Sequence, residues 1–236
     1  MKNKIAFITG GSKGIGFGIA ESLAKEGVHS ILTSRTQKNA DQAAKAINDK
    51  YHVNCIGVEA DVRDYDAVEK AVKTSIEEFG QIDYVIANAG LGHFASIEDM
   101  SIEQWHEVIE TNLNGVFYTI KSTVEALVKS KGYFISISSL AGTNFFAGGA
   151  AYNASKFGVT GFTQAVMLDL RQKGVKVSTI MPGSVATHFN NHEPNDKDAW
   201  KIQKEDIGEM VVNLFKMNPR TLPSKIEVRP SMPPQK

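Results

Sequence analysis

Near its amino terminus the chain reads Ile5-Ala-Phe-Ile-Thr-Gly-Gly-Ser-Lys-Gly-Ile-Gly16, a short apolar run followed at once by a glycine-rich turn. The apolar run predicts a buried β-strand. After Gly16 an amphipathic pattern begins and stops at Gly27, a residue typical of helix ends. A strand that passes through glycines directly into a helix is the first half of a β-α-β unit.

The rest of the chain repeats this alternation. Strands are expected at 5–9, 30–34, 53–60, 83–87, 133–138, 175–181 and 225–228. Helices are expected from Gly16 to Gly27 and at 37–50, 65–79, 102–129 (kinked, or two helices), 152–172 and 204–216. This order predicts an α/β fold with a doubly wound, mostly parallel sheet and helices on both faces. No linker or change of composition divides residues 1–236, so we expect a single domain.

The composition excludes several classes of protein. Lys plus Arg and Asp plus Glu each number 26, so the charge balance gives no support for binding nucleic acid or a membrane surface. The single cysteine, Cys55, lies in an apolar run and is expected to be a small core residue. No apolar stretch approaches the roughly 20 residues of a membrane-spanning helix. We therefore expect a cytoplasmic protein.

The glycines of the first turn fit a dinucleotide site. Gly10, Gly14 and Gly16 lie between the first strand and the first helix, where a close backbone and free N–H groups can bind a pyrophosphate. Their spacing, G-x-x-x-G-x-G, differs from the G-x-G-x-x-G of common dehydrogenases. Glycines also serve plain turns, and a purely structural turn is the alternative.

The end of the second strand bears on the kind of dinucleotide. An acidic residue there would bind a ribose 2′-hydroxyl and repel a 2′-phosphate. This chain has Ser34 and Arg35 instead, with Lys13 in the glycine turn as a second cation. Two cations and a hydroxyl favour NADP over NAD. The alternative is that Arg35 is a solvated loop charge.

A second informative stretch runs from Ser138 to Lys156. Tyr152 and Lys156 are four residues apart, so on a helix they share one face. An ammonium beside a partly desolvated phenol favours the ionised phenol, and we expect the pKa of Tyr152 to lie below its usual value of about 10. Taken alone, a Y-x-x-x-K pair is more often a solvated helix face. Either Ser138 or Ser139 could accompany the tyrosine.

Five motifs occur in one order: T-G-x-x-x-G-x-G, A-D-V, N-A-G, the serine and Y-x-x-x-K. With them the chain resembles the short-chain dehydrogenase/reductase family over residues 4–229. The resemblance implies a Rossmann-type sheet of about seven parallel strands, and hydride transfer between a nicotinamide and a carbonyl or alcohol carbon. One departure is Ala87, which stands where the family usually has the first asparagine of N-N-A-G.

The resemblance implies four catalytic residues. Tyr152 would donate the proton in reduction, and Lys156 would lower its pKa and hold the nicotinamide ribose. Asn112 would position a water for proton relay. Ser139 would bond the substrate oxygen, because the thirteen-residue gap to Tyr152 and the glycine that follows favour it over Ser138.

The resemblance also implies cofactor contacts along the whole chain. The three turn glycines would hold the pyrophosphate, Asp61 and Val62 would contact the adenine, and Asn88 would tie neighbouring strands near the ribose. Val185 and Thr187 would reach the carboxamide. The full set is Gly10, Ser12, Lys13, Gly14, Ile15, Gly16, Ser34, Arg35, Asp61, Val62, Asn88, Ala89, Gly90, Tyr152, Lys156, Pro182, Gly183, Val185 and Thr187.

The substrate is expected to be a small or medium carbonyl compound, because the segment 188–195 that would shape the pocket is short and polar. In this family, 3-oxoacyl thioesters are one common substrate. Four residues near the expected pocket could line it or belong to the core: His93, Phe94, Phe145 and Phe146.

The helix that follows Tyr152 is apolar nearly all round, which requires cover on more than one side. Family members commonly pair this helix across a dimer, so we expect a homodimer or homotetramer. His188 and His192 lack an obvious third ligand, and no metal is expected. The alternative to an enzyme is an NADP(H)-binding sensor or scaffold with incidental catalysis. The four intact catalytic positions favour the enzyme.

Overall fold

The computed structural model describes residues 1–232 and contains one seven-stranded sheet in the order β3-β2-β1-β4-β5-β6-β7. The strands are β1 (Ile5–Ile8), β2 (His29–Ser34), β3 (Cys55–Glu59), β4 (Tyr84–Ala87), β5 (Tyr133–Ile137), β6 (Lys176–Pro182) and β7 (Lys225–Val228). All neighbouring strands are parallel. The expected Rossmann-type, doubly wound parallel sheet is confirmed.

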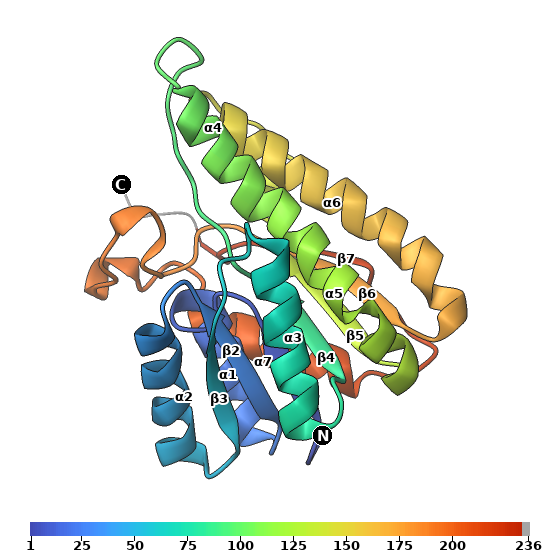
Figure 1. The fold of residues 1–236 in the computed structure, drawn as a ribbon. Coiled ribbons are helices and arrows are strands. Elements are labelled where there is room, and N and C mark those ends of the chain that lie inside the picture. The colour runs from blue at the N-terminus through green and yellow to red at the C-terminus, as the bar shows by residue number, and fades with distance from the viewer. Residues whose placement is uncertain (233–236) are drawn as a thin grey trace.

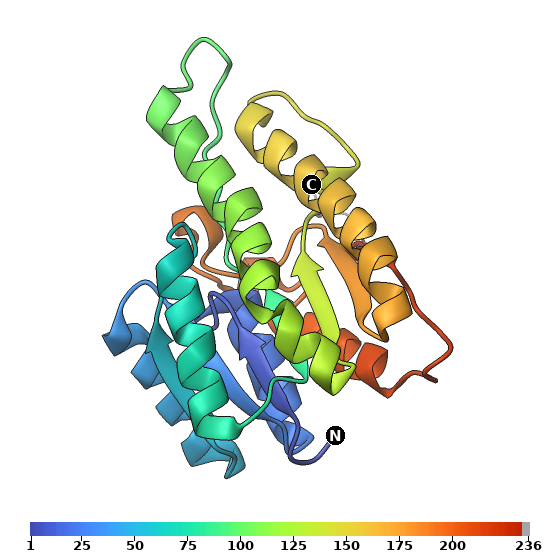
Figure 2. The same ribbon diagram turned by 45° about the vertical axis from the view of Figure 1, so that its right-hand side comes forward.

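Helices cover both faces of this sheet (Figures 1 and 2). They are α1 (Gly14–Lys25), α2 (Gln37–Tyr51), α3 (Tyr65–Phe79), α4 (Ile102–Ile109), α5 (Gly115–Ser130), α6 (Ala150–Leu170) and α7 (Lys204–Lys216). One apolar core joins α1, α2 and α7 to the sheet, and a second joins α3, α5 and α6 to its other face. Within β1, Ala6 and Ile8 enter the first core while Ile5 and Phe7 enter the second, as the alternation of a strand requires.

Helix bounds agree best with the sequence where capping residues mark them. The Asp64 side chain accepts hydrogen bonds from the first-turn N–H groups of α3, and Gly80 ends that helix in the left-handed region at φ 75°. Helix α1 begins at Gly14, two residues before the expected start at Gly16. The glycine-rich first turn has no apolar periodicity from which this start could be predicted. Helix α6 likewise begins before Tyr152, at Ala150.

The expected kink in the 102–129 helix is a turn of π-helix. Residues Glu110–Asn114 form this turn and separate α4 from α5. A π-turn inserts an extra residue into a helix and often accompanies a functional site. Here it contains Asn112, one of the four expected catalytic residues.

The order of the strands fixes where a ligand can bind. Strand β1 has β2 on one side and β4 on the other, so the chain reverses its winding direction between them. In sheets of this kind, ligands bind in the crevice outside the carboxyl ends of the strands at that reversal. Within residues 1–232, no helix is both long enough and apolar enough to cross a membrane.

Candidate active site

The glycine turn after β1 is fixed to the end of β4. Gly10 and Gly14 have φ values of 61° and 59°, a region that favours glycine. A Cβ on Gly16 would lie 2.5 Å from Asn88 Nδ2. The Asn88 amide donates to the carbonyl oxygens of Thr9 and Gly10, at 2.9 and 3.1 Å, so it ties β4 to the turn as the family resemblance implied.

The amino end of α1 lacks side-chain partners and has the properties of an anion site. Its N-cap residue, Lys13, makes no side-chain capping bond, and its first turn contains no acidic residue. The first N–H groups of a helix have no partner within the helix and attract negative charge. A Cβ added at Gly14 would touch only the Thr187 side chain, at 3.5 Å, which leaves a cradle beside the helix start. These residues fit a dinucleotide phosphate.

The end of β2 gathers hydroxyls and cations beside the glycine turn. The Ser12 and Ser34 hydroxyls lie 3.2 Å apart, and Lys13 and Arg35 are exposed. Arg63 forms a two-pronged ion pair with Asp61 and holds the pKa of that carboxyl below its usual range, and the charge of Arg35 adds to the effect. Arg35 therefore lies within electrostatic reach of the expected adenine site.

Two expected cofactor residues take part mainly in packing. Val62 is buried, and its Cγ2 would lie 2.8 Å from a Cβ placed on Gly115, at the start of α5. Ile15 is partly buried and packs against the core on the α1 side of the sheet. Ala89 supports the glycine turn through its N–H, which donates to Thr9 Oγ1 at 3.2 Å.

Tyr152 and Lys156 lie on the same face of α6, and Lys156 Nζ is 5.7 Å from the centroid of the Tyr152 ring. The ammonium is buried and donates to the carbonyl oxygen of Ile137 at 3.0 Å. Burial lowers the pKa of Lys156 to about 8. The lysine thus points from α6 to the carboxyl end of β5.

The expected lowering of the Tyr152 pKa is wrong for this structure. Burial raises the pKa of the phenol, and the polar side chain of Ser139 opposes that rise. Burial is the larger effect because the ammonium of Lys156 is directed to a backbone carbonyl rather than to the phenol oxygen. Tyr152 is consequently protonated at neutral pH.

The two neighbouring serines have separate surroundings. The Ser138 hydroxyl is buried, donates to the Lys156 carbonyl oxygen at 3.0 Å and lies 3.0 Å from Thr160 Oγ1. Ser139 is only partly buried, and its hydroxyl accepts from Ala141 N at 3.1 Å and donates to Pro182 O at 3.4 Å. Of the two serines, Ser139 is the one whose side chain affects the pKa of the Tyr152 phenol.

Asn112 contacts the site from the π-helical turn. Its side chain is buried, accepts from Leu91 N at 2.8 Å, and donates to Leu91 O and to Ser155 Oγ. A Cβ on Gly90 would lie 3.2 Å from Asn112 Oδ1 and 3.5 Å from Lys156 Nζ. Gly90 therefore lies next to both the Asn112 and the Lys156 side chains.

The loop after β6 closes the site from the other side. The N–H of Gly183, which follows Pro182, donates to Val228 O at 2.8 Å, and Val185 forms an isolated bridge with Ile202. The Thr187 side chain faces Gly14 and accepts from Phe189 N at 3.3 Å. The loop thus joins the glycine turn to the aromatic residues around Tyr152.

Two phenylalanines lie against Tyr152, and a third lies against one of them. We refer to Phe94, Phe146, Tyr152 and Phe189 as the aromatic cluster. The Tyr152 ring centroid lies 5.4 Å from that of Phe94 and 5.7 Å from that of Phe189, and Phe94 lies 5.9 Å from Phe146. Of the other two expected pocket residues, Phe145 is 85% exposed and His93 turns to Glu107, at 2.7 Å.

Sequence reasoning missed two features of the site. Thr9 Oγ1 accepts hydrogen bonds from the backbone N–H groups of Asn88 and Ala89. The available signal was its position between the first strand and the glycine turn. Glu107 pairs with both His93 and Arg63, at 2.7 and 3.8 Å. No sequence motif marks Glu107, because its partners come from two distant loops.

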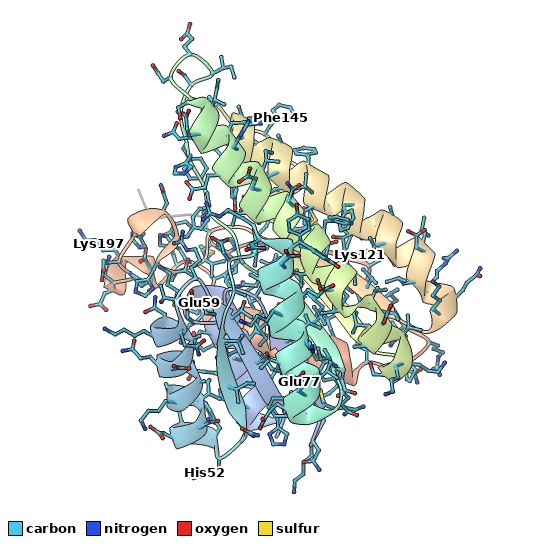
Figure 3. All side chains as sticks on the ribbon, in the orientation of Figure 1. His52, Glu59, Glu77, Lys121, Phe145 and Lys197 are labelled. Carbon is cyan, nitrogen blue, oxygen red and sulfur yellow. The ribbon has the colours of Figure 1, made fainter. Side chains whose placement is uncertain are left out.

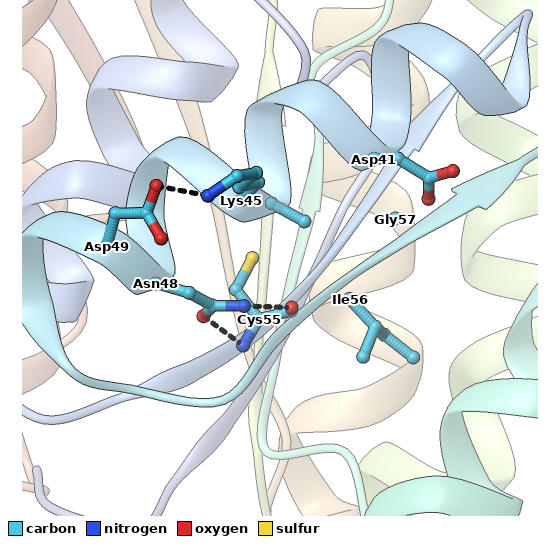
Figure 4. A pocket seen from close by; sticks show the side chains of 8 residues that line it. Asp41, Lys45, Asn48, Asp49, Cys55, Ile56 and Gly57 are labelled. Carbon is cyan, nitrogen blue, oxygen red and sulfur yellow. Dashed lines mark hydrogen bonds and ion pairs between the residues drawn. The ribbon is translucent and has the colours of Figure 1, made fainter.

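A separate hollow of about 410 Å³ lies between α2 and β3 (Figure 4). It is bordered by the Lys45–Asp49 ion pair and by Asn48, which bonds the backbone of Cys55. Cys55 begins β3, so the hollow lies at the opposite end of the sheet from Tyr152. Burial raises the pKa of the Cys55 thiol to about 12, in keeping with a core residue.

The chain is similar to many known proteins. Residues 4–198 match the family model described as short chain dehydrogenase. An uncharacterised oxidoreductase of Staphylococcus saprophyticus is 32% identical over 98% of both chains. The 3-oxoacyl-[acyl-carrier-protein] reductase of Escherichia coli is 32% identical over 89% of this chain and 84% of its own. Among solved structures, an alcohol dehydrogenase of the archaeon Thermococcus sibiricus, complexed with 5-hydroxy-NADP, has a TM-score of 0.92 at 29% identity and 99% coverage of both chains.

Proposed function

Because the chain belongs to the short-chain dehydrogenase/reductase family, we propose that it is an NADP(H)-dependent oxidoreductase acting on a carbonyl or secondary alcohol. The substrate is of small or medium size. The observation that carries this proposal is that Tyr152 and Lys156 lie together on α6, with the lysine bonded to Ile137 at the carboxyl end of β5, two residues before Ser139. We propose further that residues 1–236 form one domain.

The cradle at the start of α1 supports a dinucleotide cofactor. Gly14 leaves room for phosphate oxygens, while Gly10 and Gly16 let the turn pack closely against Ala89 and Asn88. The first N–H groups of the helix would supply hydrogen bonds to the phosphate. Lys156 would hold the ribose, and Thr187 would contact the carboxamide. The archaeal alcohol dehydrogenase, which is complexed with a form of NADP, agrees with this assignment.

The chain's own residues supply the proton chemistry. In reduction, Tyr152 gives its proton to the carbonyl oxygen as negative charge builds there, and Ser139 donates a hydrogen bond to the same oxygen. The raised pKa of Tyr152 keeps the phenol in the form that a donor needs. When bound, the nicotinamide supplies the hydride. Lys156 and Asn112, whose side chains both lie next to Gly90, would return a proton to Tyr152 from water.

The direct test is turnover. The protein is incubated with NADPH and a panel of ketones and aldehydes, and loss of the reduced nicotinamide absorbance is followed. Consumption that depends on the carbonyl compound supports the proposal. Tight binding of NADPH without turnover of any compound would favour a sensor or scaffold instead.

The preference for NADP is assigned to Arg35, with Lys13 and Ser34 beside it. Arg35→Asp is expected to move the ratio of kcat/KM for NADPH over NADH towards NADH by about 10- to 100-fold, because a carboxylate there repels a 2′-phosphate and accepts from a 2′-hydroxyl. Steady-state kinetics with both cofactors measure this ratio. Lys73→Asp, with the same change of charge on α3, is the control and should leave the ratio unchanged. An unchanged ratio in Arg35→Asp would reassign the preference to Lys13.

A homodimer or homotetramer is proposed from the outer face of α4, α5 and α6. This face exposes large apolar side chains: Trp105, Phe117, Phe157 and Leu168. The ring of Phe117 on α5 lies 6.1 Å from that of Phe162 on α6, so apolar side chains of the two helices contact each other. Such a surface is typical of a protein interface.

Size-exclusion chromatography with light scattering is expected to give at least about 51 kDa, twice the 25.7 kDa of one chain. Leu168→Glu should shift the protein towards 25.7 kDa, because it buries a charge in the apolar contact. Met217→Glu, after α7 on the opposite side of the sheet, should not change the mass. A wild-type mass of one chain at micromolar concentration would contradict the proposed oligomer.

A further inference from the structure

The aromatic cluster is built into the loops that carry it. A Cβ on Gly92 would lie 2.8 Å from the tip of Phe94 and 2.9 Å from the tip of Phe189. A Cβ on Gly149 would lie 2.6 Å from the Phe146 ring. Two glycines therefore provide the space in which the three rings sit, since any larger residue would displace them.

The loops are also fixed to one another. Ala95 N donates to Gly148 O at 3.0 Å, and Ala95 forms an isolated bridge with Gly149. The third ring follows Thr187, whose hydroxyl holds the backbone of Phe189. Phe94, Phe146 and Phe189 come from three separate loops, after β4, β5 and β6. Phe94 and Phe189 lie against Tyr152, and Phe146 lies against Phe94.

The three phenylalanine rings are partly exposed and are not buried in the core. Phe94, Phe146 and Phe189 remain 37–48% exposed although they contact one another. Phe94 meets both Tyr152 and Phe189 edge to face, at interplanar angles of 67° and 60°. Edge-to-face rings present both π-faces and positive edges, the arrangement that attracts a further aromatic ring.

Charge near the cluster argues against an acidic substrate. The loop segments that carry it, 92–95, 145–149 and 187–190, contain no Lys or Arg. The ring of His93 is directed to Glu107, and the ammonium of Lys156 to the Ile137 carbonyl. A substrate with a negative charge close to its carbonyl group would find no Lys or Arg in these segments to bind.

We propose that the preferred substrate is a neutral aryl ketone or aldehyde, whose ring is held by Phe94, Phe146 and Phe189 while its carbonyl meets Tyr152. This inference rests on the proposed oxidoreductase activity. A rigid ring also loses less conformational freedom on binding than a linear chain of equal size. The cluster therefore discriminates by shape as well as by contact.

The test compares acetophenone with 2-octanone, which has the same number of carbon atoms in a linear chain, and with acetoacetyl-coenzyme A. With NADPH, kcat/KM for acetophenone is expected to exceed that for each of the other two by about tenfold or more. Equal or greater kcat/KM for 2-octanone or the thioester would overturn the inference and leave the oxidoreductase activity standing. No reduction of any carbonyl compound would overturn both.

Two variants test whether the substrate selectivity depends on the aromatic cluster. Phe94→Leu is expected to reduce the acetophenone to 2-octanone selectivity about tenfold, because leucine keeps the bulk and loses the ring. Phe145→Leu is the matched control, since Phe145 is 85% exposed at the outer end of the α4–α6 pair, and its selectivity should equal that of the wild type (Figure 3). NADPH binding by titration confirms that both variants fold. Equal selectivity of the two variants would overturn the assignment.

Discussion

Tyr152→Phe is expected to lower kcat for carbonyl reduction by about 10²- to 10⁴-fold, the usual contribution of a general acid. The substitution removes only the phenol oxygen, so the ring keeps its contacts with Phe94 and Phe189. Affinity for NADPH should change by no more than about twofold, because the proton donor acts on the substrate oxygen. Single-turnover kinetics and fluorescence titration of NADPH measure the two quantities separately.

Tyr51→Phe provides the control for this experiment. Tyr51 ends α2, and its hydroxyl bonds Glu21 at 3.3 Å, well outside the site. Its kcat should match that of the wild type. If Tyr152→Phe kept most of the wild-type rate, the role of proton donor would have to pass to another group.

The neighbouring serines are expected to give opposite results when each is changed to alanine. Ser139→Ala should lower kcat by about 10²- to 10³-fold, because it removes a hydrogen-bond donor from the oxygen on which charge develops. Ser138→Ala should keep most of the activity and destabilise the fold by about 1–3 kcal/mol, because it leaves a buried network without one partner. Steady-state kinetics and urea unfolding of both variants measure the two effects.

The two serine variants are informative together, because one is expected to lose activity and the other stability. The Lys156 carbonyl keeps Thr160 as a donor, at 2.9 Å, so Ser138→Ala should not displace the lysine. A loss of activity in Ser138→Ala as large as that in Ser139→Ala would contradict separate roles. A Ser139→Ala variant with normal kcat would remove Ser139 from the catalytic group.

Elements with local signals were predicted closely. Helix α3 was predicted at its observed bounds, 65–79, with Gly80 marking its end, and β7 was also predicted at its observed bounds. Strand β3 was predicted too long, at 53–60, because the apolar residues at its ends also favour a strand. Only Cys55–Glu59 pairs with β2. The π-helical turn was expected only as a kink, because one inserted residue leaves no distinct pattern.

Some features of the candidate site could likewise be predicted from the sequence, and others depended on the fold. The motif residues pointed to the glycine turn and to Ser139, Tyr152 and Lys156 because their spacing is local or their order is shared with a family. The direction of the Tyr152 pKa could not be obtained from an i, i+4 pair, because burial and the partner of the lysine depend on β5. The aromatic cluster depends on three loops that meet only in the folded chain.

The burial of Lys156 also sets a trade-off between stability and activity. Its pKa in the folded chain is about 8, against an ordinary 10.5. Below pH 8 the folded chain must hold a desolvated charge, which costs about 3 kcal/mol at about 1.4 kcal/mol per pKa unit. As the pH rises from about 8 to 10.5, only the unfolded chain remains charged, and this penalty disappears. At neutral pH the buried Lys156 therefore makes the fold less stable, although the proposed reaction requires this lysine. Selection for thermal stability alone would remove it.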